Sequence, residues 1–146
     1  MNLPFLRHLP SLGRRPLHRI VAETPGAEAA LQHLLTELPE LLMAAVVATD
    51  SERVVGSYTS QPNLWPVAAA SFWTAMVQQQ QASQVAQGQG DEQLEEILTT
   101  LPTQLHLLRL RPDGQQLLYL AVGAHDTNLA LARELMRQAI DLLITT

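Results

Sequence analysis

The feature that most constrains the fold is residues 41–59, LLMAAVVATDSERVVGSYT, which read as two strands folded against each other. Leu41–Ala48 is a continuous apolar run, a polar turn follows at 49–52, and Arg53–Thr59 again carries β-branched residues. Such runs on both sides of a short Asp/Ser turn predict a β-hairpin. Because the first run has no polar alternation, its strand should be covered on both faces. We therefore expect a central sheet between layers of helices.

A second hairpin is predicted near the C-terminal end of the chain. Leu105–Leu110 and Gln116–Val122 are both apolar on two faces, and the sequence RPDG lies between them. In such a turn proline presets φ and glycine accepts a positive φ. These two strands should also be central in the covered sheet.

Three helices are predicted around these hairpins. The first begins at Thr24, with Pro25 in the first helical position, where its missing N–H costs nothing. The second enters through 61–63 and runs to about residue 83. The third, 128–144, has apolar residues along one side and charged residues along the other, so it should cover one face of the sheet.

The second predicted helix is apolar around more of its circumference than packing against a sheet requires. Its region also holds both tryptophans and one phenylalanine within nine residues, 65–73. Aromatic residues are enriched at protein interfaces. We therefore expect one side to pack on the sheet and another to meet a partner; deep burial within one subunit is the alternative.

Residues 94–101 are ambiguous. Their apolar positions fit both the helical spacing i, i+3, i+4, i+7 and the alternation of a strand, and pattern alone favours a helix. The preceding glutamine-rich run contains GQG at 88–90, which lacks the strand and the third glycine of a dinucleotide-binding turn. We interpret that run as a loop.

Composition removes several classes of function. The 146-residue chain, long enough for one domain with its own core, has no cysteine, and all nine basic residues are arginines. Disulfides, thiolate ligands, P-loop lysines and Schiff-base chemistry are therefore excluded. No apolar run has the length of a signal-peptide core or of a membrane span, about 18 residues, so we expect a soluble, cytoplasmic protein.

Charge divides the chain at residue 22. Residues 1–22 hold four arginines and no acid, whereas residues 23–146 hold five arginines and fourteen acids, a balance of −9. Because the larger part is acidic, nucleic-acid binding by it is not expected. We expect 1–22 to be a flexible basic arm, with docking to an acidic partner or an anionic membrane surface as the alternative. The arginines that would carry such docking are Arg7, Arg14, Arg15 and Arg19.

The order helix, strand, strand, helix, ambiguous element, strand, strand, helix resembles the Roadblock family of dynein-light-chain-like proteins, which in bacteria include regulators of small GTPases. The resemblance covers about residues 27–145. It is carried by VVATDSERVVGSY, the alanine-rich second helix, ILTTLPTQLHLLRL, the strand DGQQLLYLAV and the last helix after HDTN. It implies that 94–100 is an edge strand, and we adopt that expectation against the periodicity.

The fold implied by the resemblance is an α+β three-layer sandwich of profilin-like, Roadblock type. It has a five-stranded antiparallel sheet of order 2-1-5-4-3, with one helix on one face and two on the other. Family members usually dimerise through the second helix and the edge strand, which would protect that edge from uncontrolled pairing. The residues expected at the dimer or partner interface are Trp65, Ala69, Phe72, Trp73, Met76, Gln80, Leu94, Ile97 and Leu98.

The function implied by the resemblance is a non-catalytic, homodimeric regulator that binds a Ras-like small GTPase in one nucleotide state and, in some members, stimulates hydrolysis. A nucleotide-independent adaptor or scaffold subunit is the alternative, and a ligand-binding sensor domain is a third interpretation. Residues 23–146 would form the Roadblock-like domain.

Chemistry carried by the chain itself is not predicted. The five histidines lie in no HxxxH or HExxH spacing, and no GxSxG elbow is present, so we expect no metal, cofactor or catalytic residue. Glu95 and Glu96 are interpreted as a solvated edge. Arg109 and Arg111 are interpreted as solvent-facing strand residues, with an arginine finger for a partner GTPase as the alternative.

Overall fold

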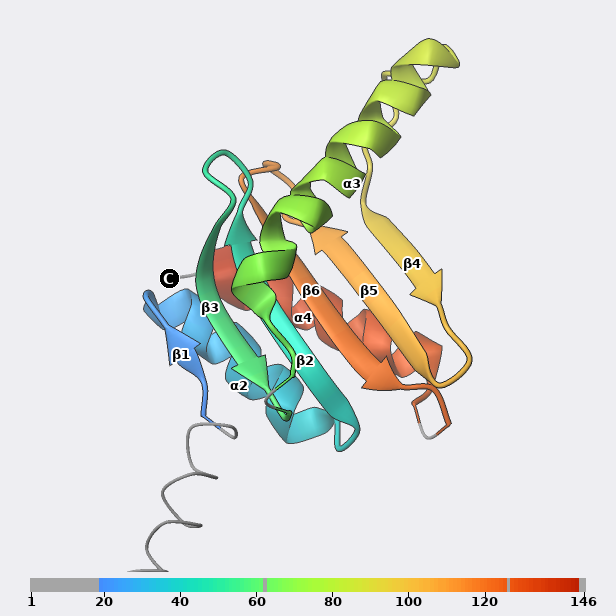
Figure 1. The fold of residues 1–146 in the computed structure, drawn as a ribbon. Coiled ribbons are helices and arrows are strands. Elements are labelled where there is room, and N and C mark those ends of the chain that lie inside the picture. Colours follow the sequence, from blue (N-terminus) through green and yellow to red (C-terminus); the bar gives the residue numbers. More distant parts are fainter. Residues whose placement is uncertain (1–18, 62, 126, 145–146) are drawn as a thin grey trace, which may run out of the picture.

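The computed structural model describes residues 19–61, 63–125 and 127–144. Within these residues six strands and three helices follow one another along the chain (Figure 1). In order they are β1 (Val21–Ala22), α2 (Pro25–Glu37), β2 (Leu41–Ala48), β3 (Arg53–Thr59), α3 (Pro66–Ala86), β4 (Glu96–Thr100), β5 (Gln104–Leu110), β6 (Gln116–Gly123) and α4 (Leu129–Ile144).

The six strands form one antiparallel sheet of order β1-β3-β2-β6-β5-β4. The five longer strands keep the expected order, but the expected number of strands, five, is wrong. The additional strand β1 pairs with β3 through Val21 opposite Ser57 and Ala22 opposite Gly56. It covers backbone groups that β3 would otherwise leave unpaired. A two-residue strand is too short to show a period in the sequence, which is why it was assigned to the arm.

The three layers match the expectation: α2 and α4 lie on one face of the sheet, and α3 crosses the other (Figure 1). Alternation along the central strands supplies both cores. On β6, Leu118, Leu120 and Val122 join the α2/α4 cluster. Leu117 and Tyr119 join the α3 cluster. The central strands are therefore covered on both faces, as the apolar runs predicted.

The first helix begins where the sequence placed it. Thr24 is the N-cap of α2, and its Oγ1 accepts a hydrogen bond from the backbone N–H of Ala27 at 3.1 Å. Pro25 occupies the first turn, where no N–H is needed. Gly56 lets α2 approach β3 closely, because a Cβ there would lie 3.0 Å from Leu31 Cδ1 and 3.2 Å from Ala27 Cβ.

The ambiguous segment is a strand, so the expectation adopted from the resemblance is confirmed and the periodicity was misleading. β4 pairs with β5 from Glu96 opposite Arg109 to Thr100 opposite Leu105. Ile97 packs against the α3 cluster, while Leu98 lies opposite Leu107, a member of the α2/α4 cluster. The pairing with β5, which lies beyond a local sequence window, decides the conformation.

Candidate functional site

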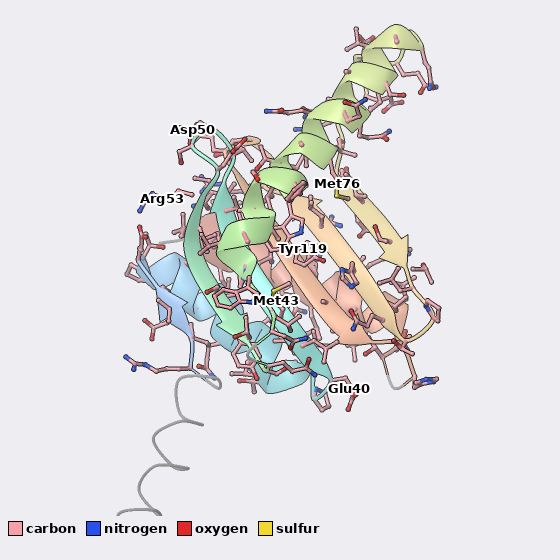
Figure 2. The ribbon with its side chains drawn as sticks, in the orientation of Figure 1. Glu40, Met43, Asp50, Arg53, Met76 and Tyr119 are labelled. Carbon is pink, nitrogen blue, oxygen red and sulfur yellow. The ribbon has the colours of Figure 1, made fainter. Side chains whose placement is uncertain are left out.

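The inner side of α3 is fixed by four buried residues, Ala70, Trp73, Thr74 and Val77. The indole of Trp73 stacks on the ring of Tyr119 from β6, with centroids 3.9 Å apart and planes at 17°. Figure 2 shows Tyr119 and Met43 of the sheet beneath α3. Trp73, expected at a partner interface, is therefore a core residue, only 5% exposed, that anchors α3 to its own sheet.

The outer side of α3 carries large apolar side chains in water. Trp65, Phe72 and Met76 are 69%, 70% and 38% exposed. At about 100° per residue the N-cap residue Trp65 and the helical residues Phe72 and Met76 fall within about 40° of one another. This stripe lies about 60–100° around the helix axis from Trp73 and about 100–180° from the other three buried residues. We call Trp65, Phe72 and Met76 the outer stripe. Ala69, between the stripe and the sheet, is half-buried.

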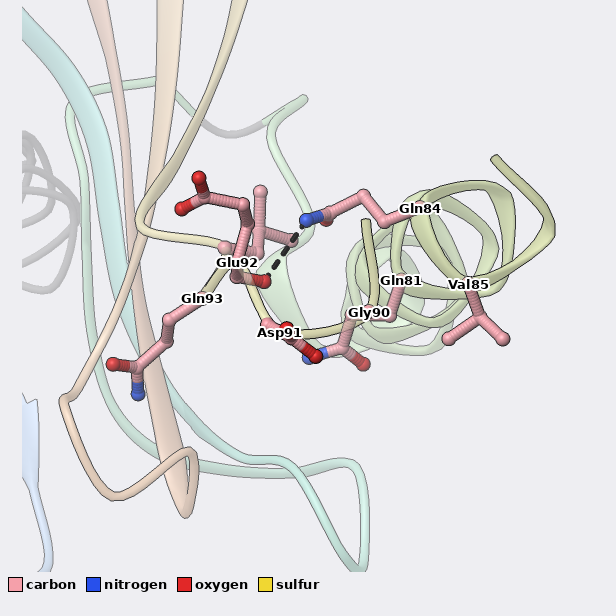
Figure 3. Close-up of a pocket in the computed structure, with 8 residues that line it drawn as sticks. Gln81, Gln84, Val85, Gly90, Asp91, Glu92 and Gln93 are labelled. Carbon is pink, nitrogen blue, oxygen red and sulfur yellow. Dashed lines mark hydrogen bonds between the residues drawn. The ribbon is translucent and has the colours of Figure 1, made fainter. Parts of the chain in front are cut away.

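The C-terminal half of α3 extends past the sheet (Figure 1). None of its buried residues lies beyond Val77. The following loop folds back on this extension: Gln84 donates its side-chain Nε2 to the Glu92 carbonyl at 3.0 Å, as Figure 3 shows. A hollow of about 450 Å³ lies between helix and loop. Its described lining carries amides and carboxylates but no histidine or arginine, which gives it little means for catalysis.

A second hollow, of about 610 Å³, joins α3 to the edge strand. Its lining is Met76, Gln79, Gln80, Ala82, Ser83 and Ile97. The structure thus brings together three of the predicted interface residues, Met76, Gln80 and Ile97. Over the described residues, the outer edge of β4 has no strand partner. We call this hollow and the free β4 edge the α3/β4 surface.

The other predicted interface residues lie apart from that hollow. Leu94 packs partly against the α3 cluster. Leu98 is 36% exposed and faces the α2/α4 side of the sheet. Of the arm arginines, Arg19 is exposed just before β1, and Arg7, Arg14 and Arg15 fall outside the described residues.

On the sheet surface under α3, His106 and Tyr119 form one partly buried contact. Gln104 Oε1 lies 2.8 Å from Nε2 of His106 and can only accept, so Nε2 carries the proton and Nδ1 accepts from the Tyr119 hydroxyl. Burial lowers the pKa of His106 and raises the pKa of Tyr119 to about 12. Both groups are therefore neutral at pH 7 and hold the sheet surface beneath α3 in place.

No other arrangement in the described part of the chain suggests catalysis. It contains no group of three or more His, Cys, Asp or Glu residues that could hold a metal ion. Arg109 lies on the α4 face, 3.5 Å from Glu96 and 4.0 Å from Glu95, away from the outer stripe. Glu96 also pairs with Arg133 at 2.8 Å. Arg109, Glu95, Glu96 and Arg133 thus form one ion-pair network.

No helix among the described residues is both long and apolar enough to cross a bilayer.

Comparison with known proteins gives structural relatives only. No protein-family model matches the sequence, and no curated protein matches it significantly. Myxococcus xanthus MglB superposes with a TM-score of 0.73 at 15% identity, covering 84% of this chain and 95% of that one. A Roadblock/LC7 domain from Streptomyces avermitilis gives 0.65 at 14% identity, covering 75% and 88%. An MglB structure with a tetrameric arrangement gives 0.68 at 16% identity, covering 88% and 94%.

The superpositions support an α+β fold with three helices and an antiparallel sheet, and the resemblance seen in the sequence is confirmed at the level of the fold. Identities this low establish the fold alone. The chain has the Roadblock/LC7 fold.

Proposed function

We propose that this chain forms a homodimer through the α3/β4 surface and the outer stripe, and that the dimer regulates a Ras-like small GTPase by binding one of its nucleotide states. The observation that carries the proposal is the exposure of Trp65, Phe72 and Met76 on one side of α3. Met76 also lines a hollow with Ile97 of β4, the strand whose outer edge has no partner among the described residues. The proposed regulator supplies no catalytic side chain of its own.

Dimer formation is supported by the cost of leaving this surface in water. An aromatic side chain buries about 150–250 Å² when it is fully covered, and apolar burial is worth about 25 cal/mol per Å². Exposed aromatic anchors are therefore typical centres of an interface. Pairing two β4 edges would also satisfy the free backbone groups there and continue the sheet across two subunits. The tetrameric arrangement of one MglB structure shows self-association on the same fold.

Regulation of a GTPase is supported by the fold and by the lack of catalytic chemistry around α3. The family that the sequence resembles includes, in bacteria, regulators of small GTPases. A surface of exposed apolar residues can favour one nucleotide state of a partner by binding that state more tightly, without taking part in hydrolysis. Arg109 is held by Glu95 and Glu96 on the opposite face, so the arginine-finger alternative gains no support.

The test of self-association compares Phe72→Ser with Leu131→Ser. Phe72 is on the outer stripe, whereas Leu131 is a comparably exposed apolar residue of α4 on the far side of the sheet. We expect sedimentation or light scattering to show a dimer for the wild type and for Leu131→Ser, and a monomer for Phe72→Ser with unchanged circular dichroism. A dimer that survives Phe72→Ser, or a wild-type monomer, would contradict the proposed interface.

The test of GTPase binding uses the wild-type protein as bait in a lysate of the source cell. One sample contains a non-hydrolysable GTP analogue and a parallel sample contains GDP. We expect a small GTPase to be retained mainly in one sample, and Phe72→Ser to lose it. The purified GTPase then serves for turnover assays with and without the regulator. Recovery of the same partners in both samples, with no GTPase among them, would contradict the GTPase proposal and favour the adaptor function.

The charge of residues 1–22 favours a second candidate function, a nucleotide-independent adaptor. That segment carries +4 against −9 for the remainder, so it is suited to an acidic partner. Deleting 1–19, which removes all four arginines and keeps β1, should then remove partner binding while the oligomeric state stays unchanged. Undiminished binding to partner and to anionic liposomes would exclude a docking role for the segment.

A further inference from the structure

Residues 1–18 are an apolar and basic segment of the chain, and they lie outside the described residues. They carry three arginines and no acid. Seven of them have large apolar side chains: Met1, Leu3, Phe5, Leu6, Leu9, Leu12 and Leu17. The outer stripe, for its part, is exposed over the described part of the chain. One chain therefore contains both an uncovered apolar surface and an apolar segment that could cover it.

The chain enters the domain on the face of the sheet that carries α3. β1 pairs with β3 through Val21 opposite Ser57, at the edge of the sheet seen in Figure 1. Ile20 and Ala22 pack against the α2/α4 cluster, so the side chain of Val21, between them, lies on the α3 face. Val21 is 62% exposed there. Residues 1–18 therefore join the domain beside an exposed apolar residue on the face that α3 crosses.

The outer stripe is within reach of residues 1–18. Continuing the antiparallel register of β1 and β3 brings Arg19 level with Thr59, about 5 Å away. The chain from Thr59 to Trp65 spans at most about 21 Å, and the stripe from Trp65 to Met76 covers about 17 Å along α3. The far end of the stripe is thus within about 43 Å of Arg19, whereas 18 extended residues span about 60 Å.

The charges around α3 favour an arginine-containing segment. Between Arg53 and Arg109 the sequence has no arginine or lysine and four acids, and this range contains α3, the following loop and β4. At the end of the stripe, Gln79 and Gln80 line the hollow next to Met76, and glutamine side-chain oxygens accept hydrogen bonds from guanidinium groups. The helix α4, on the other face, carries two arginines. The α3 side is therefore the more complementary to residues 1–18.

We propose that residues 1–18 dock on the outer stripe of α3 in the same molecule, with their apolar side chains against Trp65, Phe72 and Met76. Docking covers apolar surface that the monomer otherwise exposes, and it competes with a second copy for the same side chains. The effect on dimerisation rests on the proposed function, whereas the docking itself does not. If the segment covers the stripe in about half of the molecules, the dimer Kd is raised about fourfold, because both subunits must be uncovered.

Docking is tested on the full-length protein by paramagnetic relaxation. The chain has no cysteine, so Ser11→Cys accepts a single nitroxide label near the middle of the segment. In a dilute, monomeric sample we expect the amide NMR signals of Phe72 and Met76 to lose intensity. The signal of Leu131, on α4 across the sheet, should keep it. Further dilution should not change the loss, because the docking is intramolecular.

Matched substitutions connect this loss of intensity to the outer stripe. Phe72→Ser should restore most of the Met76 signal. Val67→Ser is the control, because Val67 is 76% exposed on the same helix but about 140–180° around its axis from the stripe. This control should leave the loss of intensity at Met76 unchanged.

Competition with the dimer is tested by sedimentation of full-length variants. Phe5→Ser combined with Leu9→Ser removes two apolar side chains from the segment and should lower the dimer Kd about fourfold. His8→Ser, a polar change within the same segment, should leave the Kd unchanged. A tighter dimer also separates this inference from the adaptor function, in which the segment has no effect on the oligomeric state.

Three NMR results would overturn the docking. The first is a loss of intensity at Met76 no greater than that at Leu131, and the second is a loss that Phe72→Ser leaves unchanged. The third is a loss seen only when nitroxide-labelled and isotope-labelled copies are mixed, which would place the segment on a second molecule. A dimer Kd that Phe5→Ser with Leu9→Ser does not change would overturn the competition. Docking in a chain that never dimerises would support the docking and contradict the proposed dimer, so the two failures are distinct.

Discussion

The two faces of the sheet are covered by helices to different extents. On one face α2 and α4 pack against each other and against the strands, in a cluster of twenty buried residues. On the other face a single helix, α3, covers a cluster of eleven. The outer stripe of α3 points away from the sheet and is exposed, and β4 has no further strand beside it among the described residues. The α2/α4 face therefore holds the larger share of the buried core, while the α3 face leaves apolar side chains exposed.

The largest expected effect tests the α2/α4 face. Leu34 of α2 is fully buried, so Leu34→Ala should lower the free energy of unfolding by about 2–5 kcal/mol through lost burial and a residual cavity. Urea denaturation followed by circular dichroism measures the change. Leu131→Ala, at a position 49% exposed on α4, is the control and should cost much less. An equal loss of unfolding free energy in both variants would contradict the view that the buried side of α2 and α4 stabilises the fold.

Gly56→Ala tests how closely the same face is packed. The added Cβ would lie 3.0 Å from Leu31 Cδ1 and 3.3 Å from the backbone oxygen of Val21, so we expect a loss of about 1–3 kcal/mol in unfolding free energy. Gly123→Ala is the matched strand glycine, where the nearest atom is the mobile Oε1 of exposed Glu40. Thermal unfolding of both variants should rank Gly56→Ala as the less stable; the reverse order would refute close packing at Gly56.

A smaller effect tests the α3 face through pH. Burial lowers the pKa of His106 below its ordinary value of 6.5, so the folded protein favours the neutral ring. The corresponding stability is present above the pKa of the unfolded chain and is lost as pH falls through the folded-state pKa. Between pH of about 7.5 and about 5.5 the wild type should therefore lose more unfolding free energy than His106→Gln. Parallel slopes in urea titrations would show that His106 has no part in acid sensitivity.

The smallest expected effect on folding comes from the outer stripe. Phe72→Ser changes an exposed side chain. In samples dilute enough to be monomeric, the free energy of unfolding of the variant should therefore differ from that of the wild type by less than about 0.5 kcal/mol. The same substitution should abolish self-association. A loss comparable to that of Leu34→Ala in a dilute, monomeric sample would mean that Phe72 contributes to the core, and the contrast between the two faces would fail.

Much of the fold could be predicted because its signals are local. The two hairpins, the start of α2 at Thr24 and the side of α4 that faces the sheet all follow from turn chemistry, capping and periodicity within a few residues. The structure confirms each of them. The strand order came from the resemblance rather than from any pattern of residues.

The candidate site was only partly predictable. Aromatic density identified α3 as the element that carries an exposed apolar side, but it could not separate Trp73, which is buried, from Phe72, which is exposed. Successive residues along a helix point about 100° apart around its axis. Which of two neighbouring residues faces the sheet is therefore known only when the position of the sheet relative to the helix is known. The cavity lined by Arg109, Arg111 and Arg137 gave no signal in the sequence, because the packing of α4 against the sheet brings Arg137 to the other two.

By itself the sequence determined the local elements, the exclusion of cysteine and lysine chemistry, and the acidic balance of residues 23–146. Tertiary pairing made 96–100 a strand against its own periodicity, added Val21–Ala22 to the sheet, and brought Arg109, Arg111 and Arg137 to the lining of one cavity. The physical reason is the same in each case. These features depend on hydrogen bonds and contacts between residues distant in the chain, whose free energy outweighs the local preferences that a sequence displays.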